Sequence, residues 1–194
     1  SNTWSTIWNG IHQCYMFQES LKQVSNEYVT DEMKKQYLAE SNFLIAYYHF
    51  LSMRSYGPTM IIRSVIDLET PISGFPERSS IDEVVAFINE KLDEAMSEGG
   101  LPTTWSGKDY GRATRLAALA LKSRVYLYAA SPLYNGNTEM YADFRSPLDG
   151  RQLIAQEKSQ AKWEISATQT KYAIDEVEKA KFHLYHDADA GEPS

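Results

Sequence analysis

The sequence predicts an all-α fold built from antiparallel helix pairs. In five segments of the 194-residue chain, apolar residues recur at steps of three and four, the spacing that places side chains on one face of a helix. N-cap residues, glycines or prolines mark several boundaries of these segments. Only one short stretch has the β-branched composition of extended chain. Helices packed on helices are therefore the expected architecture.

Two helices are predicted in the first 58 residues. Residues 4 to 24 form a helical stripe with an aromatic face, made of Trp4, Trp8, Ile11 and Tyr15. Thr30 and Asp31 are N-cap candidates for a second helix, and Tyr56-Gly57-Pro58 is a stop signal at its end. The short link between the two helices predicts an antiparallel pair.

An extended crossing and a third helix follow. Residues 60 to 68, MIIRSVIDL, are apolar and β-branched, and the prolines and glycine in the next eight residues indicate a loop. Ser80 with Glu83 three positions later fits the capping box of an amphipathic helix, which Gly99-Gly100 ends. Residues 101 to 110 are then expected to form a polar loop.

The stretch from Gly111 to Gly136 predicts a central helix around which the others pack. Its helical periodicity starts at Ala113, and its many alanines would let another helix approach closely. The helix should therefore be buried on more than one side and pair with the third helix. Pro132 removes a backbone donor and disfavours helical geometry at Ser131, which predicts the stop.

The last part of the chain predicts a loop and a fifth helical region. Residues 134 to 150 are rich in Asn, Pro, Asp and Gly, whereas helical spacing resumes at about Leu153 and continues to Leu184. The final residues are expected to be unstructured. Helix pairs in series are typical of tetratricopeptide-like repeats, although no strict repeat consensus is present.

Composition excludes several functional classes. A formal net charge of −7 and a sequence pI near 5.1 argue against a nucleic-acid partner, because phosphate binding needs a basic surface. No apolar run approaches the roughly 20 residues that cross a bilayer, and the first residues do not resemble a signal peptide. The single cysteine, Cys14, has no partner for a disulfide or a structural zinc site. No metal or cofactor is expected.

Two loops combine aromatic and short polar side chains. In the first, Trp105 and Tyr110 flank Asp109, and the second contains Tyr134, Asn135 and Tyr141. Aromatic faces stack on the C–H faces of sugars while amides and carboxylates hydrogen-bond hydroxyls, so these six residues are the candidate ligand-binding set. Loop aromatics also commonly anchor a loop to its own domain, and that alternative stays open.

Other chemistry-bearing residues have a structural explanation. The acidic pairs Asp82-Glu83 and Asp93-Glu94 lie on amphipathic helices, where a solvated face is the ordinary interpretation. A loose metal site could be assembled from His183, His186, Asp187 and Asp189, but no further ligand cluster supports it. We expect His12 and His49 to be satisfied core histidines, and Trp4, Trp8 and Trp163 to be packing residues. No enzyme class is indicated.

Five blocks of the sequence occur in the order of one family's motifs. They are Trp4-x3-Trp8-x2-Ile11, residues 39–50 with Tyr56-Gly57-Pro58, Arg78-Ser79 with Leu101-Pro102, residues 111–134, and Trp163 with Ala173-Ile174-Asp175 and His183-Leu184-Tyr185. On these blocks the chain resembles the SusD/RagB family of outer-membrane nutrient-binding lipoproteins, and the fourth block is the closest match. Departures include Ile45 in place of an Arg and Lys91 in place of an Asp.

The resemblance implies a tetratricopeptide-like, SusD-like superhelix with long loops. Family members are far longer, so residues 1–194 would be a single SusD-like helical domain that is truncated at both ends. Cys14 does not match the lipidated cysteine of the family, which would lie in a missing N-terminal segment. The full-length protein would be lipid-anchored and surface-exposed on the outer membrane, where the scaffold docks on a SusC-like TonB-dependent porin. Ligand residues would lie largely outside these helices.

The predicted function is therefore binding without catalysis. The protein would capture an oligosaccharide by aromatic stacking and hydrogen bonding and deliver it to the SusC-like porin. One alternative is a helical scaffold that binds only a protein partner, and another is capture of a peptide. The sequence names no particular sugar.

Overall fold

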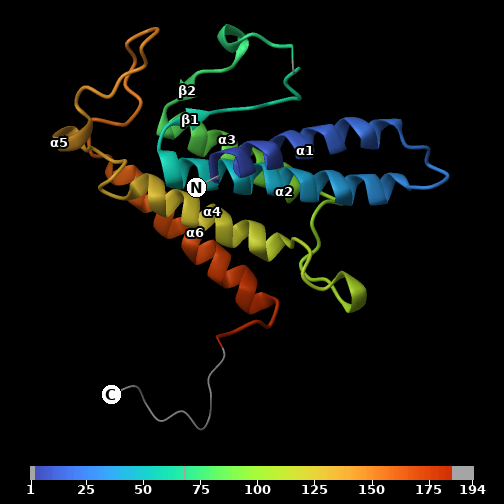
Figure 1. Ribbon diagram of the computed structural model, residues 1–194. Coiled ribbons are helices and arrows are strands. Elements are labelled where there is room, and N and C mark those ends of the chain that lie inside the picture. Colours follow the sequence, from blue (N-terminus) through green and yellow to red (C-terminus); the bar gives the residue numbers. More distant parts are fainter. Residues whose placement is uncertain (1–2, 68, 185–194) are drawn as a thin grey trace.

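The computed structural model describes residues 3–67 and 69–184, and its architecture is a series of packed helices (Figure 1). The helices, in chain order, are α1 Thr3–Gln23, α2 Asp31–Tyr56, α3 Ile81–Ala95, α4 Arg115–Ala130, α5 Thr138–Tyr141 and α6 Gln160–Lys179. The packed pairs are α1 with α2, α2 with α3, α3 with α4, and α4 with α6. The prediction of an all-α fold with antiparallel helix pairs is confirmed.

The α1–α2 hairpin is held by close backbone approach and by buried polar contacts. Gly10 of α1 faces the ring of Tyr48, and a Cβ at position 10 would lie 2.5 Å from Tyr48 Cζ. Further along the hairpin, Gln18 Nε2 donates to Ser41 Oγ at 3.1 Å and to Asn42 Oδ1 at 2.9 Å. Thr30 caps α2 as predicted, since its side chain accepts from the Met33 amide.

The extended crossing after α2 is anchored by two buried side chains. Tyr15 OH donates to the Ile62 carbonyl at 2.7 Å, and the Ile62 amide donates to His49 Nε2 at 3.3 Å. His49 Nδ1 in turn lies 2.8 Å from the Ile45 carbonyl, so its Nδ1–H tautomer satisfies both ring nitrogens. His49 is therefore a satisfied core histidine, as predicted.

Two short strands flank the loop that follows this crossing. β1 Thr59–Met60 pairs antiparallel with β2 Arg78–Ser79, with Thr59 opposite Ser79. A short 3₁₀ turn, η1 Ile72–Gly74, lies between them. The sequence indicated extended chain at residues 60–68 but not this pairing, because two residues are too few to form a recognisable strand pattern.

The capping box predicted for α3 is present. The Glu83 amide donates to Ser80 Oγ at 3.3 Å, and Glu83 Oε2 accepts from the Ser80 amide at 2.7 Å. The inward face of α3 includes Val84, Ile88 and Leu92, all fully buried against α2 and α4. Helix α3 therefore joins the α1–α2 hairpin to the second half of the fold.

Helix α4 differs from its prediction at the start, whereas its packing on two neighbouring helices, one of them α3, agrees with the prediction. It begins at Arg115 rather than near Ala113, because Thr114 is extended and its side chain accepts from the Ala117 amide at 3.1 Å. It ends at Ala130 before Pro132, as predicted. It packs on α3 and α6, but Leu127 is 50% exposed on a remaining open face. Helix α2 likewise lies between two neighbours, α1 and α3.

The fifth helical region is shorter than predicted. Leu153 and Ile154 are almost fully buried in a non-helical return segment, where the Leu153 carbonyl accepts from the Ile81 amide at 3.0 Å. Helix α6 begins only at Gln160 and ends at Lys179, and Lys181 has a left-handed φ of 63°. The Phe182 amide then bonds back to the Val177 carbonyl, which closes the helix end. The predicted unstructured tail lies outside the described residues, as does Tyr185 of the fifth motif.

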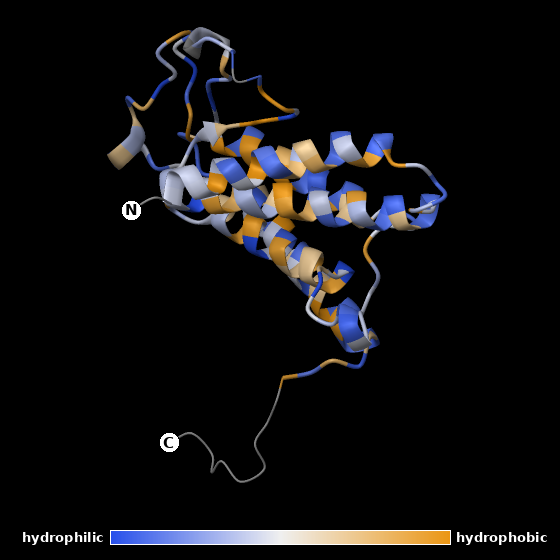
Figure 2. Ribbon diagram, turned by 45° about the vertical axis from the view of Figure 1, so that its right-hand side comes forward, coloured by the Kyte–Doolittle hydropathy of each residue, from blue (hydrophilic) through white to orange (hydrophobic). Residues whose placement is uncertain are grey.

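The loops lie on different sides of the helix stack. Figures 1 and 2 show the loops between β1 and β2 and between α5 and α6 projecting from one side, while the loop before α4 lies at the far end of that helix. Figure 2 also shows apolar residues concentrated where the helices meet. Among the described helices, none has the length and apolar character that a membrane crossing requires.

Gly10→Ala should destabilise the fold by about 1–2 kcal/mol, because overpacking against Tyr48 outweighs the helix propensity gained by alanine. Urea unfolding of the single variants and of the double variant Gly10→Ala/Tyr48→Ala measures the coupling. In the Tyr48→Ala background the alanine should be neutral or stabilising. An equal cost in both backgrounds would show that the ring does not set the approach of α1 and α2.

His49 should make the fold acid-sensitive. Burial lowers the pKa of His49 to about 4 from its ordinary 6.5, so the unfolded chain binds a proton at pH 4.5 and the folded chain largely does not. The free energy of unfolding therefore keeps its full value at pH values well above 6.5 and decreases as the pH falls from 6.5 towards 4. Lowering the pH from 7.5 to 4.5 should cost the fold about 2.5 kcal/mol of stability through His49 alone.

The measurement is urea unfolding at these two pH values for the wild type and for His49→Gln, which does not titrate. Carboxylates contribute to acid sensitivity in both proteins, so the difference between them isolates His49. Equal losses of stability would contradict the prediction.

Candidate ligand-binding pockets

Helix α4 separates the six candidate ligand residues into two groups. Trp105, Asp109 and Tyr110 precede its first turn, whereas Tyr134, Asn135 and Tyr141 follow its last (Figure 1). A helix of 16 residues is about 24 Å long, so the two loops cannot meet over one sugar ring. The structure therefore places the two groups at opposite ends of α4.

Of the first group, Trp105 and Tyr110 line what we call the Trp105 pocket, at the N-terminal end of α4, whereas Asp109 does not. This cavity has a volume of about 370 Å³ and is bounded by the loop of residues 103–112, the start of α4 and the end of α6. Tyr110 is 85% exposed, and Trp105 is half-buried with its Nε1 donating to the Ala113 carbonyl at 2.7 Å. Three threonines, Thr103, Thr104 and Thr114, add hydroxyl groups to the wall. Aromatic rings beside hydroxyls can stack on a sugar and hydrogen-bond to it.

Arg112 fixes the loop of this pocket. Its guanidinium carbon lies 4.2 Å from the centroid of the Trp105 ring, and its nitrogens pair with Glu40 Oε1 at 2.6 Å and Asp109 Oδ1 at 2.8 Å. Asp109 therefore holds Arg112 in place, so it is a positioning residue in this structure rather than a free ligand-binding carboxylate. Arg112 covers one face of the Trp105 ring, so only the other face is available for stacking on a ligand.

A second cavity, the Asn135 pocket, lies at the C-terminal end of α4. Its volume is about 510 Å³, and its wall includes Asn137, Lys158 and Trp163. Asn135 itself is buried, and its amide bridges two segments by donating to the Ala130 and Ser159 carbonyls and accepting from the Ser159 amide at 2.7 Å. Asn135 thus shapes the pocket and has little hydrogen-bonding capacity left for a ligand.

Trp163 is the pocket residue that sequence reasoning missed. Its position in the first turn of α6 predicted a packing residue, but its ring is half-buried and lines the Asn135 pocket. The short polar residues at 135–138 were a usable signal, but the sequence did not indicate that the chain would return to place Trp163 beside them. Gly136 permits this return, because a Cβ there would lie 2.7 Å from the Lys158 amide nitrogen.

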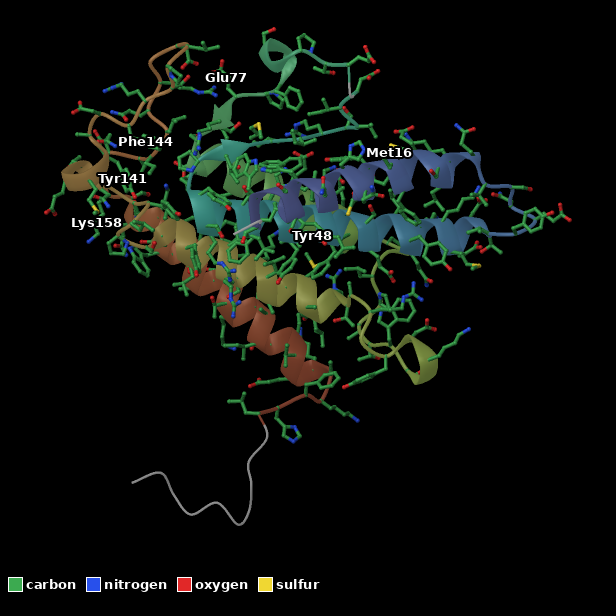
Figure 3. All side chains as sticks on the ribbon, in the orientation of Figure 1. Met16, Tyr48, Glu77, Tyr141, Phe144 and Lys158 are labelled. Atoms are coloured by element: carbon green, nitrogen blue, oxygen red, sulfur yellow. The ribbon has the colours of Figure 1, made fainter. Side chains whose placement is uncertain are left out.

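Tyr134 and Tyr141 are anchors rather than pocket residues. Tyr134 is 4% exposed and its hydroxyl donates to the Met53 carbonyl at 3.1 Å, and burial raises the pKa of Tyr134. Tyr141 is half-buried, with its ring centroid 5.9 Å from that of Phe144; Figure 3 shows the two side by side. Both rings pack against the main core. Tyr134 and Tyr141 therefore anchor their loop to its own domain, which is the alternative that the sequence left open.

The acidic pairs are engaged in ion pairs and caps. Asp82 accepts from Lys162 at 2.5 Å, Glu83 closes the α3 capping box, and Asp93 pairs with Lys122. These contacts hold α3 against α4 and α6, so the carboxylates serve the helix packing. Within residues 3–67 and 69–184, no group of three or more His, Cys, Asp or Glu side chains could hold a metal ion. Of the candidate metal set, residues 186, 187 and 189 lie outside the described residues.

Comparison with known proteins identifies relatives. Residues 1–127 match the model of a SusD-like family described as starch-binding and associating with the outer membrane. The structure is similar to that of a protein named BT4246, with a TM-score of 0.85 and 35% identity over 95% of this chain and 31% of that one. A SusD-like protein from Bacteroides fragilis gives a TM-score of 0.59 and 30% identity over 66% of this chain and 24% of that one.

A laminarin-binding SusD-like protein is also similar. Its TM-score is 0.58, with 25% identity over 66% of this chain and 26% of that protein. The chain thus spans less than a third of the length of each of these structures. No curated protein matches the sequence.

Arg112→Gln should loosen the Trp105 pocket without unfolding the helices. The variant loses both ion pairs and the cation–π contact, so amide hydrogen exchange of residues 103–113 should accelerate at least about tenfold while that of α2 stays unchanged. Lys108→Gln is the matched control, because it removes one positive charge from the same loop at an exposed position. Equal acceleration in both variants would refute the positioning role of Arg112.

Proposed function

Because the chain belongs to the SusD-like family, we propose that it captures an oligosaccharide without cleaving it. The observation that carries this proposal is the family match over residues 1–127, whose description is starch-binding, together with the aromatic and hydroxyl-rich Trp105 pocket. Most of the wall of that pocket, from Thr103 to Leu116, lies inside the matched residues. The similarity to a laminarin-binding protein supports a glucan as the ligand.

Binding at the Trp105 pocket would rely on preorganised aromatic surface. Arg112 and the Ala113 carbonyl hold Trp105 before any ligand arrives, so little conformational entropy is lost on binding. Tyr110, which is largely exposed, would then cover a sugar ring placed against Trp105. The threonine hydroxyls and the Arg112 guanidinium are donors for ring hydroxyl groups.

The Asn135 pocket is a second position for the same ligand class. Trp163 supplies an aromatic face, and Asn137 and Lys158 supply an amide and an ammonium group. Of the candidates Tyr134, Asn135 and Tyr141, it is Asn135 that lines this pocket, and its role is to hold the wall in shape. A glycan that binds at both ends of α4 would have to span about 24 Å.

The proposed role extends to a longer, membrane-associated protein. The family description associates its members with the outer membrane, and this chain spans 31% of BT4246. We therefore propose that residues 1–194 form one helical domain of a lipid-anchored, surface-exposed binding protein. That protein would deliver its glycan to a SusC-like TonB-dependent porin.

A scaffold that binds only a protein partner is the second candidate. The observation in its favour is the open face shared by α4 and α6, where Leu127, Ile174 and Phe182 are each about half exposed around a cavity of about 780 Å³. Apolar faces of this kind commonly pack against another helix. A peptide could also enter the Trp105 pocket, since threonine hydroxyls and aromatic rings suit peptide groups as well.

Calorimetry of the full-length protein with laminari-, malto- and xylogluco-oligosaccharides tests the proposal. At least one should bind, and Trp105→Ala and Tyr110→Ala should each raise its Kd about fivefold or more, as expected for the loss of an aromatic contact worth about 1 kcal/mol. Tyr110→Ala is the more informative variant, because Tyr110 is so exposed that its truncation should not disturb the fold.

Tyr28→Ala is the matched control, since Tyr28 is also highly exposed but lines neither pocket. Chromatography of the incubated glycan should find no shortened product. Binding that survives both pocket variants would remove the Trp105 pocket from the proposal, and a peptide library that binds when every glycan fails would replace the ligand class.

A further inference from the structure

A third cavity, which we call the crossing pocket, lies between α1 and the segment of residues 60–75. Its volume is about 460 Å³, within the roughly 300–1,000 Å³ of small-molecule sites. The α1 side of the wall is formed by Trp4, Ser5, Trp8, Asn9, Ile11 and His12, and the opposite side by Met60, Ile62, Ser64, Ile66, Asp67 and Phe75. All of these residues lie within the part of the chain that matches the family model.

Aromatic rings are available on both sides of this pocket. Trp4 is 38% exposed and Phe75 43% exposed, so each presents ring surface that the fold does not cover. Trp4 is steadied by edge-on contacts with Trp8 at 5.2 Å and Tyr56 at 4.9 Å between ring centroids. We expected both Trp4 and Trp8 to be packing residues. Trp8 is half-buried, whereas Trp4 keeps exposed ring surface.

The polar groups of the pocket favour a neutral, hydroxyl-rich ligand. Neither lysine nor arginine lines it, so an anionic ligand would find no charge partner in the described wall. Asp67 Oδ1 accepts from the Glu69 amide at 2.9 Å, which orients the carboxylate at the rim. Asn9 on α1 is exposed, and His12 is half-buried rather than a core residue as predicted. Together these side chains offer hydrogen-bond donors and acceptors to a ligand.

Trp8 adds an unsatisfied donor. Its Nε1 is shielded from solvent and has no hydrogen-bond partner among the described residues. A buried donor left unpaired costs roughly 1–3 kcal/mol. A ligand hydroxyl that reaches the ring edge would supply the missing acceptor.

One wall of the pocket is fixed before any ligand binds. Ile62, at its centre, is held through its carbonyl by Tyr15 and through its amide by His49. Both contacts are buried, so the crossing segment cannot move away from α1 without breaking them. The pocket is therefore preorganised at its base.

We propose that the crossing pocket is a further carbohydrate subsite, which binds one neutral pyranose ring between Trp4 and Phe75. Asn9 and Asp67 hydrogen-bond the hydroxyls of that ring, and Trp8 Nε1 donates to the hydroxyl that enters most deeply. The assignment rests on the proposed function, because it gives the same class of ligand a binding position on α1, away from both ends of α4.

Fluorine NMR of the fluorotryptophan-labelled protein tests the subsite, with the Trp8 and Trp105 signals assigned from Trp8→Phe and Trp105→Phe. On addition of the oligosaccharide that calorimetry selects, the Trp8 signal should shift. Phe75→Ala should raise the Kd measured from the Trp8 signal about fivefold, so that this shift shrinks at a ligand concentration near the wild-type Kd, while any shift of Trp105 persists. Asp67→Asn should weaken binding less, because the amide keeps one acceptor.

The outcomes separate the two proposals. A Trp105 shift with an unmoved Trp8 overturns the crossing subsite and leaves the proposed function intact. A Trp8 shift without a Trp105 shift supports the subsite and moves the capture site to α1. Absence of any shift or heat across the oligosaccharide panel overturns both. Phe75 is exposed, so Phe75→Ala should keep the wild-type melting temperature, as Tyr28→Ala should.

Discussion

The structure depends on the buried side of α2. Ile45, Ala46, Phe50 and Met53 are at most 1% exposed, because α1 covers one side of the helix and α3 the other. Polar side chains on this buried side of α2 need hydrogen-bond partners within the protein, because water does not reach them. His49 has two, the Ile45 carbonyl and the Ile62 amide, and it thereby ties the first extended segment to the core.

The same constraint applies along the rest of α2. Ser52 is fully buried and its hydroxyl lies 2.7 Å from that of Thr59, the first residue of β1. Asn42 accepts from Gln18 of α1. Each buried polar side chain thus links α2 to the segment before or after it, so the helix core also sets where the crossing segment runs. The crossing pocket lies where this segment, fixed through Ile62, runs past α1.

The other two pockets depend on α4 in a different way. This helix packs on α3 and α6 and separates two loops. Each loop is fixed by a side chain that hydrogen-bonds to backbone: Trp105 to Ala113 before the helix, and Asn135 to Ala130 and Ser159 after it. Asp82, Asp93 and Asp109 are engaged in ion pairs that hold helices and loops together. The two pockets also offer aromatic surface, hydroxyls and amides, which suit recognition of a polar ligand.

The sequence by itself determined the helical fold, most of its boundaries and its family. Thr30, the Ser80–Glu83 box and Pro132 act locally, within one turn of the residue that they cap or stop, so their effects could be predicted from spacing alone. Only the tertiary structure decided where α6 begins and which candidate residues face a cavity. Leu153 and Ile154 fit the apolar spacing of a helix, but they are buried where the non-helical chain returns to α3. Asp109 is paired with Arg112, which also pairs with Glu40, 72 positions earlier in the chain. Such contacts join distant parts of the chain, and no local periodicity encodes them.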